Sequence, residues 1–254
     1  MKVTFLGTGT STGVPMIGCK CTVCTSDDPK DRRLRTSAFI EGEATNLLID
    51  IGPDFRQQML REDITQLDAV LITHEHHDHI AALDEVRAFN FLQRKSMPVY
   101  ATNRVGGELK KRFGYVFEEV LYPGAPRIDL EEIETAKPFK VNEIEIQPIH
   151  YMHGAMPVTG FRIKDFSYLT DFKAISEEEL EKIKGSKIIA ISSIHHRPHH
   201  SHICLAEALE LLEQLQPEQA YIIHISHWMG KDVDIAPTLP SNVTLAWDGL
   251  QIEV

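Results

Sequence analysis

The feature that most constrains the fold is the run THEHHDH (residues 73–79), which directly follows the apolar segment LDAVLIT. The apolar segment predicts a buried strand, and open sheets commonly place their sites at the carboxyl ends of strands. His74 and His76 alternate and can face one metal ion, whereas the adjacent Asp78 and His79 can reach a second. Imidazole and carboxylate suit zinc, manganese or iron, and two ions about 3.5–4 Å apart form the usual hydrolytic pair. We therefore expect a two-metal site here and not a polar surface loop.

A second cluster of metal-binding residue types lies near the N-terminus, in the sequence GCKCTVC (residues 18–24). Three cysteines fall within six residues, and the only other one, Cys204, starts an amphipathic helical pattern and is expected to be a packing residue. By themselves Cys19, Cys21 and Cys24 fit a disulfide with a leftover thiol, a reactive thiol cluster, or three zinc ligands that need a fourth. In a reducing compartment, clustered cysteines are more often metal ligands than disulfides.

The N-terminal sequence, the hydropathy and the net charge predict where the protein is located and which partners it does not bind. The first residues, MKVTFLGTGTSTG, predict a strand that enters a glycine-rich turn, and they do not resemble a secretion signal. No apolar run approaches the ~20 residues that a membrane-spanning helix needs. We therefore expect a cytoplasmic protein without a membrane partner. The formal net charge of −11 argues against general adhesion to nucleic acid or to anionic membranes.

The order of apolar runs and helical patterns predicts a single domain of the α/β class over residues 1–254. No repeat, low-complexity tract or linker divides the chain. Strands are predicted at 2–7, 36–41, 45–50, 69–73, 99–102, 144–149, 160–163, 167–170, 187–192, 220–225 and 243–247. Helices are predicted at 54–62, 80–92, 104–113, 176–183 and 203–214. Adjacent strands suit antiparallel pairing in the N-terminal half, and helices separate the later strands, which fits sheets packed together with helices outside.

The motif HxHxDH after a strand resembles the signature of the metallo-β-lactamase superfamily. That resemblance implies an αββα sandwich, in which two mixed sheets pack face to face with helices outside and a two-metal site along one edge. The superfamily also needs a later histidine, a bridging aspartate and a final histidine, and this chain provides His153, Asp171 and His224 in that order. The ligands implied are His74, His76 and His153 for one ion, Asp78, His79 and His224 for the other, and Asp171 as the bridge.

Three further motifs resemble the PhnP family, the phosphoribosyl cyclic phosphate phosphodiesterases. They are GTGTSTGVP near the N-terminus, GCKCTVC after it and HISHW near the end, so the resemblance covers nearly the whole chain. In that family the cysteine cluster and a histidine three residues after the last active-site ligand hold a structural zinc. The matching residues here are Cys19, Cys21, Cys24 and His227, and three thiolates with one imidazole would form a closed tetrahedral site.

The resemblance also implies roles for residues around the ligands. His202 matches a position associated with protonating the leaving group or binding phosphate, and Asp50 matches an aspartate that orients a ligand histidine. Asp248 has two interpretations, a similar orienting role or an ordinary Asp-Gly turn. The region before His202 is unusually rich in histidine, and it leaves open the roles of His195, His196, Arg197, His199 and His200.

The function expected from this resemblance is hydrolysis of small phosphodiesters of the cyclic ribose or nucleotide type. A hydroxide held between two Mn²⁺ or Zn²⁺ ions would attack phosphorus, with Asp78 and His202 as the catalytic residues and His202 as general acid or phosphate binder. The partner expected is the small-molecule substrate, with a homodimer by analogy.

Three alternative functions fit the sequence less well. The acidic chain, with no glycine- and lysine-rich arm, argues against an RNA 3′-end nuclease of the same superfamily. A thioesterase or lactonase shares the seven ligands but usually lacks the cysteine cluster and an equivalent of His202. A non-catalytic metal-binding module commonly loses a ligand, and the ligand set of this chain is intact.

Overall fold

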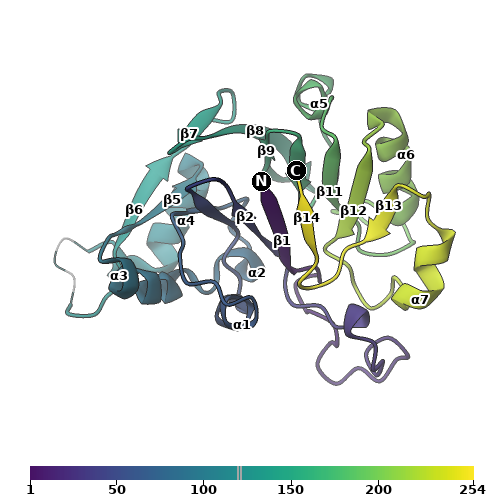
Figure 1. Ribbon diagram of the computed structural model, residues 1–254, viewed down its shortest axis with the longest axis horizontal. Helices are drawn as coiled ribbons and strands as arrows, with labels where there is room; N and C mark the ends of the chain where they lie inside the picture. Colours follow the sequence, from purple (N-terminus) through teal and green to yellow (C-terminus); the bar gives the residue numbers. More distant parts are fainter. Residues whose placement is uncertain (119, 121) are drawn as a thin grey trace.

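The computed structural model describes residues 1–118, 120 and 122–254. Over these residues the chain folds into two seven-stranded mixed sheets that pack face to face, with helices on the outer faces (Figure 1). This is the αββα sandwich that the resemblance to the metallo-β-lactamase superfamily implies. Among the described residues, none of the helices combines the length and the apolar character that crossing a bilayer would require.

The first sheet has the strand order β14-β1-β2-β3-β4-β5-β6. Strands β14, β1, β2 and β3 pair antiparallel, and β3 to β6 pair parallel. The bounds are β1 Lys2–Gly7, β2 Ser37–Glu41, β3 Asn46–Ile49, β4 Ala69–Leu71, β5 Met97–Ala101, β6 Ile128–Glu132 and β14 Gln251–Glu253.

The second sheet repeats this mixture, with the strand order β13-β12-β11-β10-β9-β8-β7. Strands β7 to β10 pair antiparallel, and β10 to β13 pair parallel. The bounds are β7 Phe139–Val141, β8 Ile144–His153, β9 Met156–Ile163, β10 Phe166–Leu169, β11 Ile188–Ser192, β12 Gln219–Ile223 and β13 Val243–Leu245.

Helices cover the outer face of each sheet (Figure 1). The α-helices are α1 Phe55–Arg61, α2 His77–Ile80, α3 Arg87–Gln93, α4 Asn103–Arg112, α5 Glu177–Ile183, α6 Leu205–Leu215 and α7 Asp232–Ile235. The 3₁₀ turns are η1 Pro29–Asp31, η2 Leu83–Val86, η3 Gly114–Val116 and η4 Ala236–Thr238. Helices α1, α3 and α4 pack on the first sheet, whereas α5 and α6 pack on the second.

The inner strands of each sheet are apolar on both faces, and both of these faces are buried. In β3, Leu47 and Ile49 belong to the core between the two sheets, while Leu48 packs under the helices of the first sheet. In β11, Ala190 faces the core between the sheets and Ile189 packs under α5 and α6. Continuous apolar runs are typical of strands covered on both sides, which is why these segments could be predicted.

The predicted helix over residues 80–92 is wrong as a single element, because the structure breaks it into the end of α2, the 3₁₀ turn η2 and α3. Ile80, Leu83, Val86 and Phe89 are all buried, at a spacing of three residues. A 3₁₀ turn keeps residues three apart on one face, whereas an α-helix rotates them away from it. The burial requirement therefore favours the tighter turn over residues 83–86.

Three strands were not predicted: β6, β7 and β14. β6 and β7 lie at the sheet edges and carry exposed charged residues such as Glu131, Glu132 and Lys140. β14 is three residues long and also forms a sheet edge. Short edge strands with one exposed face have a weak apolar pattern, so sequence periodicity does not detect them.

The fold brings several strand ends to one edge of the sandwich. Asp50 directly follows β3, and THEHHDH begins two residues after β4. In the second sheet His153 ends β8, Asp171 follows β10, and His224 follows β12. Residues that are up to 174 positions apart in the sequence therefore meet at this edge.

Candidate metal centre

The best-defined part of the site is the contact between Asp50 and His79. His79 Nδ1 lies 2.6 Å from Asp50 Oδ2, and both side chains are fully buried. Asp50 also accepts hydrogen bonds from the backbone N–H of Thr73 at 2.9 Å and from its hydroxyl at 2.8 Å. The carboxylate therefore fixes a proton on Nδ1 of His79 and leaves Nε2 directed toward Asp171, 3.1 Å away.

Two other histidines are oriented in the same way by their Nδ1 atoms. His153 Nδ1 lies 2.8 Å from the carbonyl oxygen of Ser201, which can only accept, so Nδ1 carries the proton. His74 Nδ1 lies 2.9 Å from the Thr73 hydroxyl, whose own proton goes to Asp50. In both cases Nε2 keeps its lone pair, the form in which imidazole binds a metal ion.

Asp171 lies between the histidines of the two predicted metal positions. Its Oδ2 is 3.1 Å from His79 Nε2 and 3.3 Å from His224 Nε2. Its Oδ1 is 3.9 Å from His153 Nε2 and 3.9 Å from His202 Nδ1. The two carboxylate oxygens thus face different partners, which is the arrangement that a bridging ligand requires.

The ligand atoms gather in groups whose members all lie within 4.8 Å of one another. Two groups agree with the predicted partition, namely His74 with His76 and Asp171, and Asp78 with His79 and His224. His153 instead groups with Asp171 and His202, although its ring is also 5.2 Å from that of His76. The structure therefore brings all seven predicted ligands together, and the assignment of each to one ion stays a prediction.

The chemistry of this donor set fits two cations. His74 Nε2, His79 Nε2, and both ring nitrogens of His224 are buried without a hydrogen-bond partner among the described residues. Buried polar atoms normally have a partner, and a metal ion would supply one here. Asp50, Asp78 and Asp171 add three carboxylates to the same small volume, so a positive charge is needed to balance them.

The electrostatics of the side chains agree with that reading. Burial lowers the pKa of His74 well below its ordinary value. Burial also acts to lower the pKa of His79, but the carboxylates of Asp78, Asp50 and Asp171 raise it well above its ordinary value. The carboxylates around His79 thus favour positive charge at this place, which a dication would supply, and burial favours the neutral form of His74.

The backbone at the site is strained. Asp50, Asp171 and His224 have φ values of 63°, 53° and 55°, in the left-handed region that residues other than glycine rarely adopt. Each such residue costs on the order of 1–3 kcal/mol, and such residues cluster at functional sites. This signal needs the structure, because the sequence shows only a polar residue after an apolar strand.

His202 lies beside the ligand cluster. Its ring centroid is 4.4 Å from that of His153 and 5.2 Å from that of His224. Burial lowers the pKa of His202 to about 2, with the neighbouring His224 acting in the same direction. Burial therefore favours the neutral imidazole in the absence of a bound anion. The resemblance to the PhnP family predicts that the residue at this position contacts the substrate.

The cysteine cluster forms a separate group. Cys19 Sγ and Cys21 Sγ each lie 3.3 Å from His227 Nδ1, and Cys24 completes a set whose ligand atoms lie within 4.8 Å of one another. All the cysteines of the chain are free thiols. A hydrogen bond from the backbone of Cys24 lowers the pKa of Cys21 to about 6, which favours the thiolate. The disulfide interpretation is therefore wrong, and the donor set suits one zinc ion.

The remaining sequence candidates have structural roles. The Asp248 carboxylate accepts hydrogen bonds from Thr8 N at 2.9 Å, the Thr8 hydroxyl at 2.8 Å and Leu34 N at 2.7 Å. Both of its oxygens therefore hold the N-terminal loop, and residues 248–249 form a turn, which favours the interpretation as an Asp-Gly turn. Cys204 is buried at the N-terminus of α6, where its backbone N–H donates to Glu207 Oε2 at 2.7 Å.

Sequence reasoning missed three contributors to the site. Thr73 links Asp50 to His74, and the Ser201 carbonyl orients His153. The buried Glu75 of THEHHDH pairs with Arg104 at the start of α4, which ties the metal-binding loop to that helix. A threonine directly before the first ligand histidine was a visible signal, whereas a backbone carbonyl 48 residues away from His153 has none.

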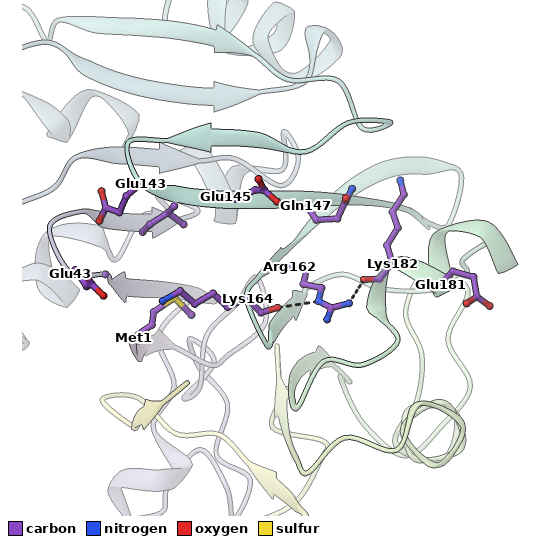
Figure 2. A pocket seen from close by; sticks show the side chains of 11 residues that line it. Met1, Glu43, Glu143, Glu145, Gln147, Arg162, Lys164, Glu181 and Lys182 are labelled. Atoms are coloured by element: carbon purple, nitrogen blue, oxygen red, sulfur yellow. Dashed lines mark hydrogen bonds between the residues drawn. The ribbon is translucent and has the colours of Figure 1, made fainter.

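A cavity far from the metal centre shows that pocket size alone does not locate the site. It has a volume of about 640 Å³ and lies near the start of β8, whereas His153 ends that strand (Figure 2). Arg162 extends across it, and its guanidinium donates to the carbonyl oxygens of Lys164 at 3.1 Å and Lys182 at 2.9 Å. The cavity contains none of the predicted site residues.

The chain resembles known proteins in both sequence and fold. A family profile described as "Beta-lactamase superfamily domain" matches residues 45–225. A solved structure described as a new diphosphatase from the PhnP family is 35% identical, covers 100% of this chain and 97% of that chain, and gives a TM-score of 0.93. Zn(2+)-bound PqqB from Methylobacterium extorquens covers 100% of both chains with a TM-score of 0.80 at 18% identity, which is a likeness of fold alone.

A curated relative differs in length. The octanoyltransferase of Porphyromonas gingivalis is 39% identical over 253 residues, which are 99% of this chain and 51% of that protein. The chain thus spans about half the length of this relative.

Proposed function

The chain belongs to the metallo-β-lactamase superfamily and, within it, to the PhnP family, and on this premise we propose that it hydrolyses small phosphodiesters. It is a metal-dependent hydrolase by membership. The observation that carries the finer proposal is the position of His202, whose ring lies 4.4 Å from that of His153 and 5.2 Å from that of His224. The substrate class proposed is a cyclic ribose or nucleotide phosphate.

The residues that would hold two divalent ions, Mn²⁺ or Zn²⁺, are those of the buried cluster: His74, His76, Asp78, His79, His153, Asp171 and His224. When bound, the two ions supply a water nucleophile at neutral pH and neutralise the charge of the phosphoryl group. Asp50 and the Ser201 carbonyl keep His79 and His153 in the tautomers that leave Nε2 available. Cys19, Cys21, Cys24 and His227 would hold one structural zinc.

His202 is the side chain proposed to act on the substrate. It comes from the segment between β11 and α6 and lies over the rings of His153 and His224. A phosphodiester beside these rings would place its leaving oxygen or a phosphoryl oxygen within reach of the imidazole. The negative charge of a bound diester would favour the protonated form of His202, which then either protonates the leaving alkoxide or donates a hydrogen bond to the phosphoryl group.

The experiment uses two diesters whose leaving groups differ. Ribose 1,2-cyclic phosphate expels an alkoxide, which needs a proton, whereas bis(p-nitrophenyl) phosphate expels a stable phenolate, which does not. The metal-loaded protein is expected to hydrolyse both, and chelation is expected to abolish both activities. If His202 is the general acid, His202→Ala lowers kcat for the cyclic ester by about 10²–10⁴-fold and the aryl ester far less. If it binds phosphate, both activities fall together.

A matched control is His150→Ala. His150 lies in the same strand as His153 but belongs to none of the ligand groups, so its loss should change neither activity. Failure of the fully metallated protein to hydrolyse any phosphodiester would contradict the proposal.

The name of the curated relative suggests an acyl compound as a further substrate to test. That protein is an octanoyltransferase about twice as long as this chain, and the thioesterase alternative involves the same acyl chemistry. An octanoyl thioester should therefore be included, and the proposal expects no turnover of it. A cytoplasmic location and a homodimer stay predictions.

A further inference from the structure

A cavity of about 490 Å³ lies in the segment that contains His202. His195, His196, Arg197, Pro198 and Trp228 line it, so its two walls come from the loop after β11 and the loop after β12. Its volume falls in the range of about 300–1,000 Å³ that is usual for small-molecule sites.

Hydrogen bonds hold these two walls in place. The Ile194 carbonyl accepts from Ser226 N at 3.1 Å and from the Ser226 hydroxyl at 2.6 Å. His196 Nε2–H donates to the Met229 carbonyl at 2.7 Å, and Trp228 N donates to Ser226 Oγ at 3.2 Å. The cavity is therefore formed before any ligand arrives, which lowers the entropic cost of binding one.

A row of aromatic rings connects this cavity to the metal centre. The ring of His202 is 5.3 Å from that of His199, which is 5.9 Å from that of His195. The ring of His195 is 5.8 Å from that of Trp228. A substrate whose phosphate lies at His202 could therefore extend along these rings into the cavity.

The chemistry of the lining selects one kind of occupant. Trp228 is 68% exposed although it is a large aromatic side chain, so most of its indole surface is open to a ligand. Arg197 is exposed and pairs with no carboxylate among the described residues, so it brings an uncompensated positive charge to an otherwise acidic protein. An aromatic surface beside a free guanidinium is typical of sites that bind nucleotides through their bases and phosphates.

We propose that the substrate is a nucleotide phosphodiester whose base stacks on Trp228 in this cavity, with Arg197 at its rim. This inference rests on the proposed function, and it chooses the nucleotide over the base-free ribose phosphate. The cysteine cluster contributes to the same wall, because the His227 ring packs 5.0 Å from that of Trp228 at an interplanar angle of 30°. The group that braces the fold would thus also position the base-stacking surface.

The first test measures binding without turnover. The chain has two tryptophans, so Trp247→Phe leaves Trp228 as the only one, and the phenyl ring still packs against Lys30. Titration of this metal-loaded variant with adenosine 5′-monophosphate should quench the Trp228 fluorescence to saturation. Ribose 5-phosphate, which lacks the base, should not quench it. Absence of quenching by the nucleotide, or equal quenching by the sugar phosphate, would overturn the inference.

The second test measures specificity as the ratio of kcat/KM for 2′,3′-cyclic AMP to kcat/KM for ribose 1,2-cyclic phosphate. Trp228→Ala should lower this ratio about 5- to 150-fold, the range for loss of one base–aromatic stack. Trp228→Phe should retain most of the ratio, and Trp247→Phe should retain all of it. An unchanged ratio in Trp228→Ala, with both diesters hydrolysed, refutes the base site alone. If neither diester is hydrolysed, the proposed function fails, and the fluorescence titration still decides the base site.

Discussion

Asp50→Asn tests how the protein prepares its ligands. The substitution conserves volume, and asparagine tolerates the left-handed backbone of position 50, where φ is 63°. The amide oxygen can still accept from the N–H and hydroxyl of Thr73, at 2.9 and 3.0 Å in the structure. Its NH₂ group, however, would face the Nδ1–H of His79, 2.6 Å away, so two donors would meet.

The expected magnitude follows from that donor–donor contact. His79 can avoid it by moving its proton to Nε2, which then no longer offers a lone pair toward Asp171, 3.1 Å away. Loss of such an orienting partner typically costs 10–100-fold in metal affinity, which corresponds to about 1.4–2.8 kcal/mol. We expect Asp50→Asn to fold and to bind its catalytic metal about 10–100-fold more weakly.

The assay is competition with a chromophoric chelator, with circular dichroism to verify folding. Asp68→Asn is the matched control, because Asp68 accepts a hydrogen bond from Asn46 N at 2.9 Å and pairs with a half-exposed Lys95 away from the ligands. This control should bind metal like the wild type. Wild-type metal affinity in Asp50→Asn, or an equal loss of affinity in Asp68→Asn, would show that Asp50 does not orient His79 for metal binding.

Three further predictions concern stability. A Cβ at Gly52 would lie 2.0 Å from the carbonyl oxygen of Asp78, so Gly52→Ala should lower the free energy of unfolding by about 1–3 kcal/mol. Gly107 lies on α4 with open space around it, so Gly107→Ala should raise the free energy of unfolding by about 0.5–1 kcal/mol. Phe161 lies in the core between the sheets, so Phe161→Ala should lower the free energy of unfolding by about 3–5 kcal/mol. Phe91 is 62% exposed, so Phe91→Ala should lower it by less than about 0.5 kcal/mol. Denaturant unfolding measures the stability of all four variants. Equal changes in the glycine pair would contradict the close approach at Gly52, and equal changes in the phenylalanine pair would contradict the difference in burial. Chelation should lower the midpoint of thermal unfolding, because a metal ion at 100 times its Kd adds about 2.7 kcal/mol to the free energy of unfolding. An unchanged midpoint in calorimetry would show that no ion stabilises the fold.

The sequence predicted most of the site because its ligands follow apolar strands. THEHHDH follows β4 and His224 follows β12, and both strands are buried on two faces and therefore easily seen as apolar runs. The cysteines could be assigned to a metal only with His227, which lies 203 residues after Cys24 and meets the cluster only in the folded chain.

Other features had no signal in the sequence. The Ser201 carbonyl orients His153 as a backbone atom, so any residue at that position could supply it. The exposed Trp228 owes its importance to the cavity beside it, and a lone tryptophan in HISHW did not indicate that cavity. Sequence pattern reports which residues are buried in elements, whereas these contacts depend on how two loops meet.

The metal content per chain decides whether a dinuclear site lies beside a separate cysteine-bound zinc. Elemental analysis should be run on the wild type, Asp171→Ala and Cys21→Ser, with hydrolysis of bis(p-nitrophenyl) phosphate measured on the same samples. We expect three ions per chain in the wild type. Asp171→Ala should retain only the cysteine-bound ion and should hydrolyse no substrate. Cys21→Ser should lose one ion and retain catalytic turnover. Loss of the catalytic ions from Cys21→Ser, with the cysteine-bound ion retained, would contradict the account.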